Sequence, residues 1–257
     1  MSTDFPGHSV RKPPEFPKVY PERIFMTALK IILCALFGYC VGGINPSYLI
    51  AKCRGFDIRR RGSGNAGASN ALISMGSSVA VFSALFDILK ATAVTMTAPL
   101  LFAGLPFAAE IGASACILGH IYPAYMQFRG GKGLACLGGA ILAIDWRFFL
   151  IMLAAELVLA LIVNYICVVP ISASFVLPVT YGLLGSDGAD VLRHAQGGWW
   201  GAAILSVASV GILLRHRVNI RRILAGKELH LSYLWSKDKA AELARIGEGP
   251  DAKKEDE

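Results

Sequence analysis

Residues 59–70 read RRRGSGNAGASN, three cations followed by glycines that alternate with small polar side chains. Glycines at this spacing let the backbone turn its N–H groups to one side, and such a nest suits phosphate oxygens. A helix expected after this stretch would point its positive end at the same place. The stretch therefore suits a phosphate-bearing ligand, although a flexible loop with topology-setting arginines has the same composition. The candidate binding side chains are Ser63, Asn65, Ser69 and Asn70.

A second glycine-rich stretch, FRGGKG at positions 128–133, presents a single cation on a flexible backbone. Gly130 and Gly131 precede Lys132, and no serine or threonine follows the lysine, so the stretch is not a Walker A loop. His120 stands shortly before it, at the expected end of a hydrophobic run. A lone histidine at such a place is more often a structural hydrogen-bonding residue than a catalyst.

A third polar stretch, RHRVNIRRILAG at positions 215–226, follows the last hydrophobic run. His216 and Asn219 are three residues apart and are therefore neighbours on one helix face. Cations at this place are also the ordinary signature of a cytoplasmic loop. Asp87 and Lys90 share a face within a hydrophobic run, where ionisable residues mark either function or a structural ion pair.

The elements that must position these residues are hydrophobic helices. Of the 257 residues, 54% are hydrophobic and only 17% are charged, and the mean hydropathy is +0.53, a composition that favours a membrane protein. The sequence predicts an all-α bundle of seven transmembrane helices, the first broken near GGINPS and the fourth short. The expected runs are 24–50, 79–101, 106–122, 133–144, 148–163, 168–184 and 199–214.

Charge distribution predicts the orientation of this bundle. The loops after the first, third and seventh runs hold most cations, which places the three polar stretches together on the cytoplasmic face and the N-terminus outside. The cations before the first run oppose this orientation. We expect residues 1–23 to form a disordered extension, 24–228 the membrane domain and 229–257 a charged tail.

Composition also argues against several classes of protein. The net charge of +7 is typical of cytoplasmic loops, and aromatic residues are not interleaved with the cations, so nucleic acid is not an expected partner. The six cysteines show neither a CxxC pair nor metal-ligand spacing, so neither a structural disulfide nor a metal site is expected. Nothing points to a signal peptide or to an obligate protein partner.

The stretches GSGNAGASN, FDILK, GHIYPAYMQFRGGKG and RHRVNIRRILAG, in this order, resemble those of the bacterial PlsY family over residues 38–228. These are integral-membrane acyl-phosphate:glycerol-3-phosphate acyltransferases. The resemblance implies a multi-pass protein of the cell inner membrane, surrounded by membrane lipid. Its active site would face the cytoplasm and transfer a fatty acyl group from acyl phosphate to the sn-1 hydroxyl of glycerol 3-phosphate. No cofactor is implied.

The resemblance also implies roles for individual residues. Ser63 and Asn65 would lie near the reacting carbonyl, and His216 and Asn219 would orient the acceptor. The basic and glycine-loop residues would hold the two phosphate groups. The substrate-binding set carried over by motif is Lys52, Ser69, Asn70, His120, Gly130, Gly131 and Lys132.

The chain departs from the family pattern at several positions. Ile73 stands where an arginine is typical, which would remove a charge-assisted contact to a phosphate. Gly43 and Cys167 replace serines, Cys136 replaces a threonine, and Ser69 replaces a threonine conservatively. A different acceptor, or a catalytically silent scaffold, would be compatible with these changes.

A transporter of a phosphorylated metabolite is the alternative from another class. Glycine loops and basic rims also serve anion passage, but no inverted repeat is evident and the polar stretches lie on one expected face. The HxxxxD arrangement of acyl-CoA-dependent acyltransferases is absent, because Tyr125 and Arg221 stand five places after the two candidate histidines.

Overall fold

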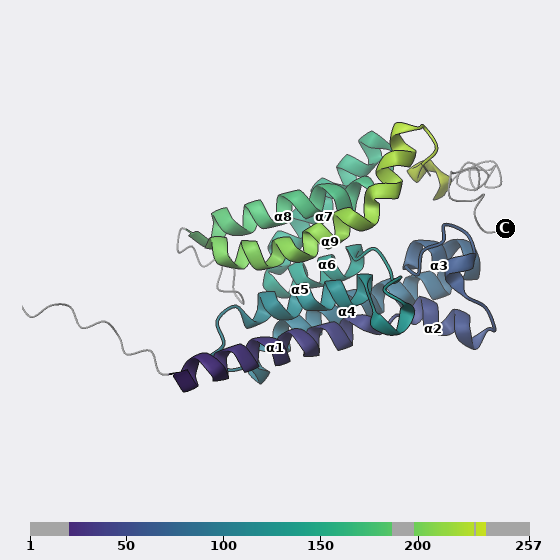
Figure 1. Ribbon diagram of the computed structural model, residues 1–257. Coiled ribbons are helices and arrows are strands. Elements are labelled where there is room, and N and C mark those ends of the chain that lie inside the picture. Colours follow the sequence, from purple (N-terminus) through teal and green to yellow (C-terminus); the bar gives the residue numbers. More distant parts are fainter. Residues whose placement is uncertain (1–20, 187–197, 229, 235–257) are drawn as a thin grey trace, which may run out of the picture.

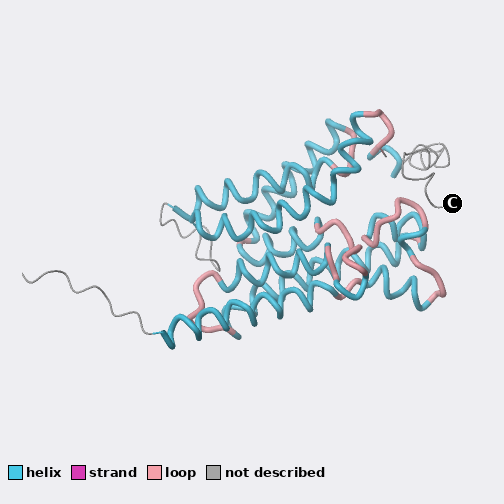
Figure 2. The backbone as a smooth tube through the Cα atoms, in the orientation of Figure 1, coloured by secondary structure: helices cyan, strands magenta, loops and turns pink. Residues whose placement is uncertain are grey.

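The computed structural model describes residues 21–186, 198–228 and 230–234, and their regular elements are helices, apart from one isolated bridge between Tyr165 and His230 (Figures 1 and 2). The α-helices are α1 (Pro21–Gly43), α2 (Pro46–Cys53), α3 (Ala68–Met75), α4 (Ser77–Leu101), α5 (Ala108–Ile121), α6 (Leu134–Ile144), α7 (Trp146–Val163), α8 (Val168–Ser186) and α9 (Gly198–Leu224). Short 3-10 turns occur at Ile58–Arg60, Ala124–Met126 and Leu231–Leu234. The expected all-helical class is confirmed.

Five of the described helices are long and apolar enough to cross a membrane, namely α1, α4, α7, α8 and α9. Their outward faces carry exposed leucines, isoleucines and tryptophans, as lipid-facing helices do. The two remaining expected spans correspond to α5 and α6, which have 14 and 11 residues and are shorter than the ~20 residues of a standard span.

The helices pack around α5, which contacts α1, α4, α6 and α9. In Figure 1, α7, α8 and α9 form one layer, and α1, α4, α5 and α6 lie beneath it. The short helices α2 and α3 pack against α4 at the end of the bundle that also holds the C-terminal end of α9. All three polar stretches are therefore carried to the same end of the molecule.

The expected break in the first hydrophobic run occurs at Ile44 and Asn45, between α1 and α2. The Asn45 side chain caps α2 by accepting a hydrogen bond from the Tyr48 N–H at 3.0 Å, and Pro46 occupies the first helical position. The Lys90 ammonium donates to the Ile44 carbonyl at 2.6 Å. The break therefore directs a backbone oxygen at the interior of the bundle.

Helices α1 and α5 lie so close together that only glycine fits at their contact. A Cβ atom at Gly38 would overlap with the Gly112 carbonyl, and one at Gly42 with the Cys116 carbonyl. A Cβ atom at Gly119 would overlap with the Tyr39 carbonyl. Small residues at helix contacts are typical of membrane bundles, where van der Waals packing drives association. This contact holds α5 at the centre of the fold.

Replacing Gly42 with leucine is expected to destabilise the protein, because the side chain would meet the backbone of Cys116 rather than a movable side chain. Overpacking of this kind costs about 1–3 kcal/mol or more. Thermal unfolding in detergent measures the loss, and Cys40→Leu, on the exposed face of the same helix, serves as the control. Equal unfolding temperatures for both variants would contradict a tight α1–α5 contact.

Helical structure and contacts extend slightly beyond both ends of the expected range 24–228. Helix α1 begins at Pro21, three residues before the expected start, while residues 1–20 of the expected extension lie outside the described residues. At the other end, residues beyond 228 contact the bundle: the Leu231 N–H donates to the Asn164 carbonyl at 2.8 Å. The Ser232 N–H donates to Asn164 Oδ1 at 3.0 Å. The remainder of the charged tail, from residue 235, is not described.

Candidate functional site

The three polar stretches line one cavity of about 530 Å³. Its polar lining comes from the loop before α3 and the start of that helix, from α4 and α5, from the loop before α6, and from the C-terminal part of α9 with the turn after it. Its apolar lining comes mainly from α3, α4, α6, α7 and the start of α8. The polar and charged lining residues are Ser63, Asn65, Ser69, Asp87, His120, Lys132, His216, Asn219, Arg222 and Glu228.

The first glycine stretch is shaped from within by Asn70. Its buried amide donates to the carbonyls of Ile58, Arg61 and Asn65 at 2.9, 2.9 and 2.7 Å, and its Oδ1 accepts from the Ser63 N–H at 2.9 Å. One side chain thus folds the whole loop, so that Asn70 acts as its scaffold and does not line the cavity.

The arginines of this stretch make structural contacts. Arg59 forms an ion pair with Asp57 at 2.7 Å and donates to the Met126 carbonyl at 2.7 Å, which ties the first loop to the second. The Arg59 guanidinium, by direct hydrogen bonding, lowers the pKa of Asp57 to about 2. Arg61 lies over the Phe56 ring at 3.9 Å. Neither arginine lines the cavity.

The second glycine stretch packs closely on the end of α5. The Gly130 and Gly131 N–H groups donate to the carbonyls of Ile121 and His120 at 3.0 and 3.1 Å. A Cβ atom at Gly131 would overlap with the His120 ring, so only glycine fits there. This packing also brings the two loops together, since a Cβ atom at Gly67 would lie 4.0 Å from Gly131 Cα.

Lys132 extends from this loop across the cavity to α9. Its Nζ donates to Asn219 Oδ1 at 2.6 Å, and the Asn219 amide donates to Glu228 Oε1 at 2.7 Å. Burial lowers the pKa of Lys132 to about 8, opposed in part by the negative charge of Glu228. The ammonium of Lys132 therefore loses its proton more readily than an exposed lysine does.

His216 lies on the same face of α9, one turn before Asn219, and both side chains are buried. Its Nδ1 is 2.8 Å from the Ile212 carbonyl, an oxygen that can only accept. Nδ1 therefore carries a proton, which leaves Nε2 as an acceptor in the neutral ring. His216 and Asn219 therefore share one face of α9, as their three-residue spacing predicts. Arg222, one turn further along the helix, also lines the cavity.

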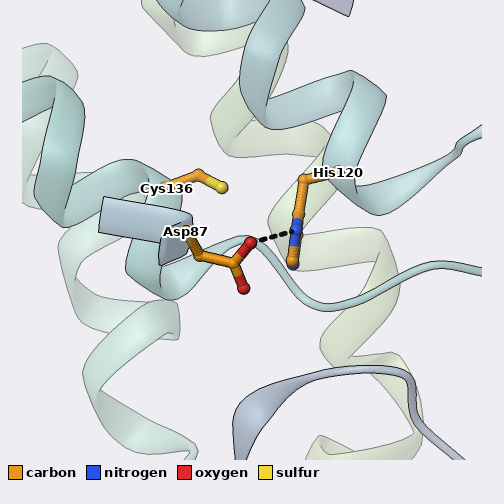
Figure 3. Close-up of side chains that lie close together, drawn as sticks. All are labelled: Asp87, His120 and Cys136. Carbon is orange, nitrogen blue, oxygen red and sulfur yellow. Dashed lines mark ion pairs between the residues drawn. The ribbon is translucent and has the colours of Figure 1, made fainter. Parts of the chain in front are cut away.

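An ionic cluster lies beneath the second loop. Asp87 Oδ1 is 2.6 Å from Lys90 Nζ and 3.3 Å from His120 Nδ1, and Cys136 lies beside them. Figure 3 shows the His120 imidazole facing the Asp87 carboxylate, with the Cys136 thiol nearby. Asp87, His120 and Cys136 could each offer a metal one ligand atom, but the Lys90 ammonium already supplies the positive charge that balances this carboxylate. The cluster is a buried ion pair joined to a histidine.

Of the eleven residues that the sequence singled out, seven line the cavity: Ser63, Asn65, Ser69, His120, Lys132, His216 and Asn219. Asn70, Gly130 and Gly131 shape its walls without lining it. Lys52 is exposed on α2, with its ammonium 5.6 Å from the Tyr48 ring, and is not brought to the cavity.

Sequence reasoning missed Arg222 and Glu228. Arg222 is three residues after Asn219, so the helical spacing could have placed it beside that residue. Glu228 carried no such signal, because it follows the end of α9 and reaches the cavity only through a turn. Two departures from the family pattern, Ile73 and Cys167, also line the cavity.

These features define a multi-pass membrane protein whose helical bundle holds, at one end, a cavity with a polar, cation-bearing wall and an apolar wall. A family model for glycerol-3-phosphate acyltransferases matches residues 32–226. The chain belongs to the glycerol-3-phosphate acyltransferase family, which confirms the resemblance found in its sequence motifs.

Relatives and solved structures agree with this assignment. Glycerol-3-phosphate acyltransferases of Brucella canis and Mesorhizobium japonicum are 33% and 32% identical over 199 residues, covering 77% of this chain and 92% and 94% of theirs. Crystal structures of PlsY, an integral membrane glycerol 3-phosphate acyltransferase, are similar in their glycerol 3-phosphate and lysophosphatidic acid forms. Their TM-scores are 0.67 and 0.65 at 28% identity, covering 80% of this chain and 97% and 99% of theirs.

Proposed function

We propose that this protein transfers a fatty acyl group from acyl phosphate to the sn-1 hydroxyl of glycerol 3-phosphate, giving lysophosphatidate and inorganic phosphate. Family membership supports the acyltransferase class over the transporter alternative. The observation that carries the proposal is the joining of two glycine loops and one face of α9 around a single cavity. Such a cavity suits two phosphate-bearing substrates held side by side.

The apolar wall of the cavity suits the acyl chain of the donor. Leu72 and Ile88 contribute to it from α3 and α4, Phe149 and Leu153 from α7, and Val169 from α8. An acyl chain buried against these side chains gains about 0.8 kcal/mol per CH₂ group removed from water. The acyl phosphate would thus lie with its chain among the helices and its phosphate toward the loops.

Little chemistry is required of the protein, because acyl phosphate is already activated. The hydroxyl oxygen of the acceptor bonds to the acyl carbon, and the bond from that carbon to the phosphate oxygen breaks. Holding both substrates in contact would supply most of the acceleration, and Ser63 and Asn65, which line the cavity, would donate to the developing oxyanion. The departing phosphate accepts the hydroxyl proton.

The side chains of the cavity support this division of roles. His216 Nε2, an acceptor, and the Asn219 amide would orient the acceptor, while Lys132 and Arg222 supply positive charge to the phosphates. Burial raises the pKa of the Cys167 thiol to about 12, with Glu228 adding to the rise, so this thiol stays neutral and is a poor nucleophile.

We further infer a seven-span topology in the cell inner membrane, with the cavity facing the cytoplasm. Helices α5 and α6 would complete the seven crossings despite their length, because non-helical backbone is tolerated at membrane depth where protein buries it. The central position of α5 and the buried glycine loop before α6 satisfy that condition. Cysteine accessibility of Ser63 and Lys227 replacements in sealed membrane vesicles would test the orientation.

A phosphate-release assay on purified, detergent-solubilised protein tests the proposed reaction. Phosphate is expected to appear from acyl phosphate only when glycerol 3-phosphate is added, with lysophosphatidate formed in equal amount. A panel of polyol phosphates tests the effect of Ile73 on acceptor choice. If no acceptor causes phosphate release, the proposed reaction is rejected, and a catalytically inactive member of the family is favoured.

A further inference from the structure

Glu228 reaches the cavity through a turn that doubles back onto α9. After the helix ends at Leu224, the Lys227 N–H donates to the Arg222 carbonyl at 2.8 Å, and Gly226 adopts a φ of +65°, a conformation that favours glycine. Glu228 is only 7% exposed, and it follows four exposed residues. The turn therefore places the carboxylate of Glu228 at the cavity, although the residues just before it lie on the surface.

The two oxygens of this carboxylate have different surroundings. Oε1 accepts from the Asn219 amide at 2.7 Å, and Asn219 Oδ1 in turn accepts from Lys132. Oε2 is buried and has no hydrogen-bond partner among the residues that the structure describes. The neighbouring Cys167 thiol is only a weak donor. A buried carboxylate oxygen without a donor is costly, which points to a donor supplied by a ligand.

A hydroxyl group is the ligand chemistry that fits Oε2. A phosphate offers a carboxylate only acceptors and negative charge, so it would move toward Lys132 and Arg222. A polyol phosphate carries both kinds of group. We propose that Glu228 determines acceptor specificity by accepting a hydrogen bond from the hydroxyl of a polyol phosphate that does not react, the sn-2 hydroxyl in glycerol 3-phosphate.

This role rests on the proposed acyl transfer and deepens it. The Asn219 amide holds Glu228 Oε1, and Lys132 in turn holds Asn219 Oδ1, so the free carboxylate oxygen has a fixed position relative to the Lys132 ammonium. A site built in this way rejects an acceptor that lacks the hydroxyl, because the buried oxygen is then left without a donor. The proposed partner of Glu228 is the hydroxyl that does not react. Loss of the Glu228 carboxylate should therefore change the preference between acceptors, and not only the rate of acyl transfer.

The test compares glycerol 3-phosphate with 3-hydroxypropyl phosphate, which keeps the reacting hydroxyl and lacks the other. The unaltered protein is expected to favour glycerol 3-phosphate in kcat/KM by more than about tenfold. Glu228→Gln keeps the size of the side chain and is expected to reduce this ratio at least about tenfold, mainly through slower use of glycerol 3-phosphate. The exposed neighbour provides the control: Lys227→Gln should leave the ratio unchanged.

Equal losses with both acceptors in Glu228→Gln would overturn the proposal, since a purely structural carboxylate or a general base would act on both. A lack of preference in the unaltered protein would overturn it as well, while leaving the acyl transfer intact. If no acceptor supports turnover, the proposed function fails, and ligand-induced thermal stabilisation still tests the binding role. Stabilisation by glycerol 3-phosphate should then exceed that by 3-hydroxypropyl phosphate, and Glu228→Gln should remove the difference.

Discussion

Replacing Lys132 with methionine is expected to reduce kcat/KM by about 10²–10³-fold, the effect of removing one oriented donor from a catalytic site. Lys132 is a cation whose ammonium spans the cavity, with Nζ 2.6 Å from Asn219 Oδ1. Its removal takes away a positive charge that lines the cavity and leaves the Asn219 side chain held by Glu228 alone. Steady-state phosphate release measures the effect.

The control for this variant is Lys30→Met, which removes a lysine from α1 whose ammonium donates to the Ala103 carbonyl outside the cavity. Activity of this control should stay close to that of the unaltered protein. Comparable losses in both variants would show that general destabilisation, rather than the charge at Lys132, accounts for the result.

The pH dependence of the unaltered enzyme should report the same lysine. Its pKa is lowered to about 8 by burial, so the charged form predominates below that pH and is lost as the pH rises through it. We therefore expect kcat/KM to fall above about pH 8. Because a bound phosphate favours the charged form, kcat should fall only at higher pH. In Lys132→Arg the side chain stays charged at these pH values, so any activity that this variant retains should not fall above about pH 8. If kcat/KM of the variant falls in the same way, a group other than Lys132 causes the decline.

Much of the site could be predicted from the sequence because its residues lie in short, local patterns. The glycine spacing of the first loop and the three-residue spacing of His216 and Asn219 each describe one element, and both features line the cavity. The residue type of Asn70 suits either a ligand contact or a loop scaffold, and in the structure its amide bonds to loop carbonyls. Only the folded loop distinguishes the two.

The features of the site that could not be predicted from the sequence depend on contacts between distant residues. Glu228 meets Asn219 through a turn after a helix end, and its burial has no periodic signal. Hydropathy predicts the bounds of α5 and α6 to within two residues, but it does not show whether helices of 14 and 11 residues complete a membrane crossing. Hydropathy records burial away from water, and it does not distinguish helix from coil in the centre of a membrane protein.

Replacing Asp87 with asparagine is expected to cost about 3–5 kcal/mol of stability, since it leaves the Lys90 ammonium as an uncompensated buried charge. The pair lies in α4 at 2.6 Å, and both side chains are under 5% exposed. Lys90→Met should destabilise for the same reason, with the charge reversed. The combined variant, Asp87→Asn with Lys90→Met, should recover most of the loss. Thermal unfolding in detergent measures all three, with Glu22→Gln on exposed α1 as the control.

Recovery of stability should not restore activity in the combined variant. Asp87 also holds His120 Nδ1, and the His120 ring packs directly against Gly131, next to Lys132. With the carboxylate gone, the ring loses its charged partner and the loop loses its fixed support. Stability and turnover should therefore separate: the double variant folds nearly as well as the unaltered protein, yet its kcat/KM stays reduced. A double variant that regains both would limit Asp87 and Lys90 to a structural ion pair without influence on the Lys132 loop.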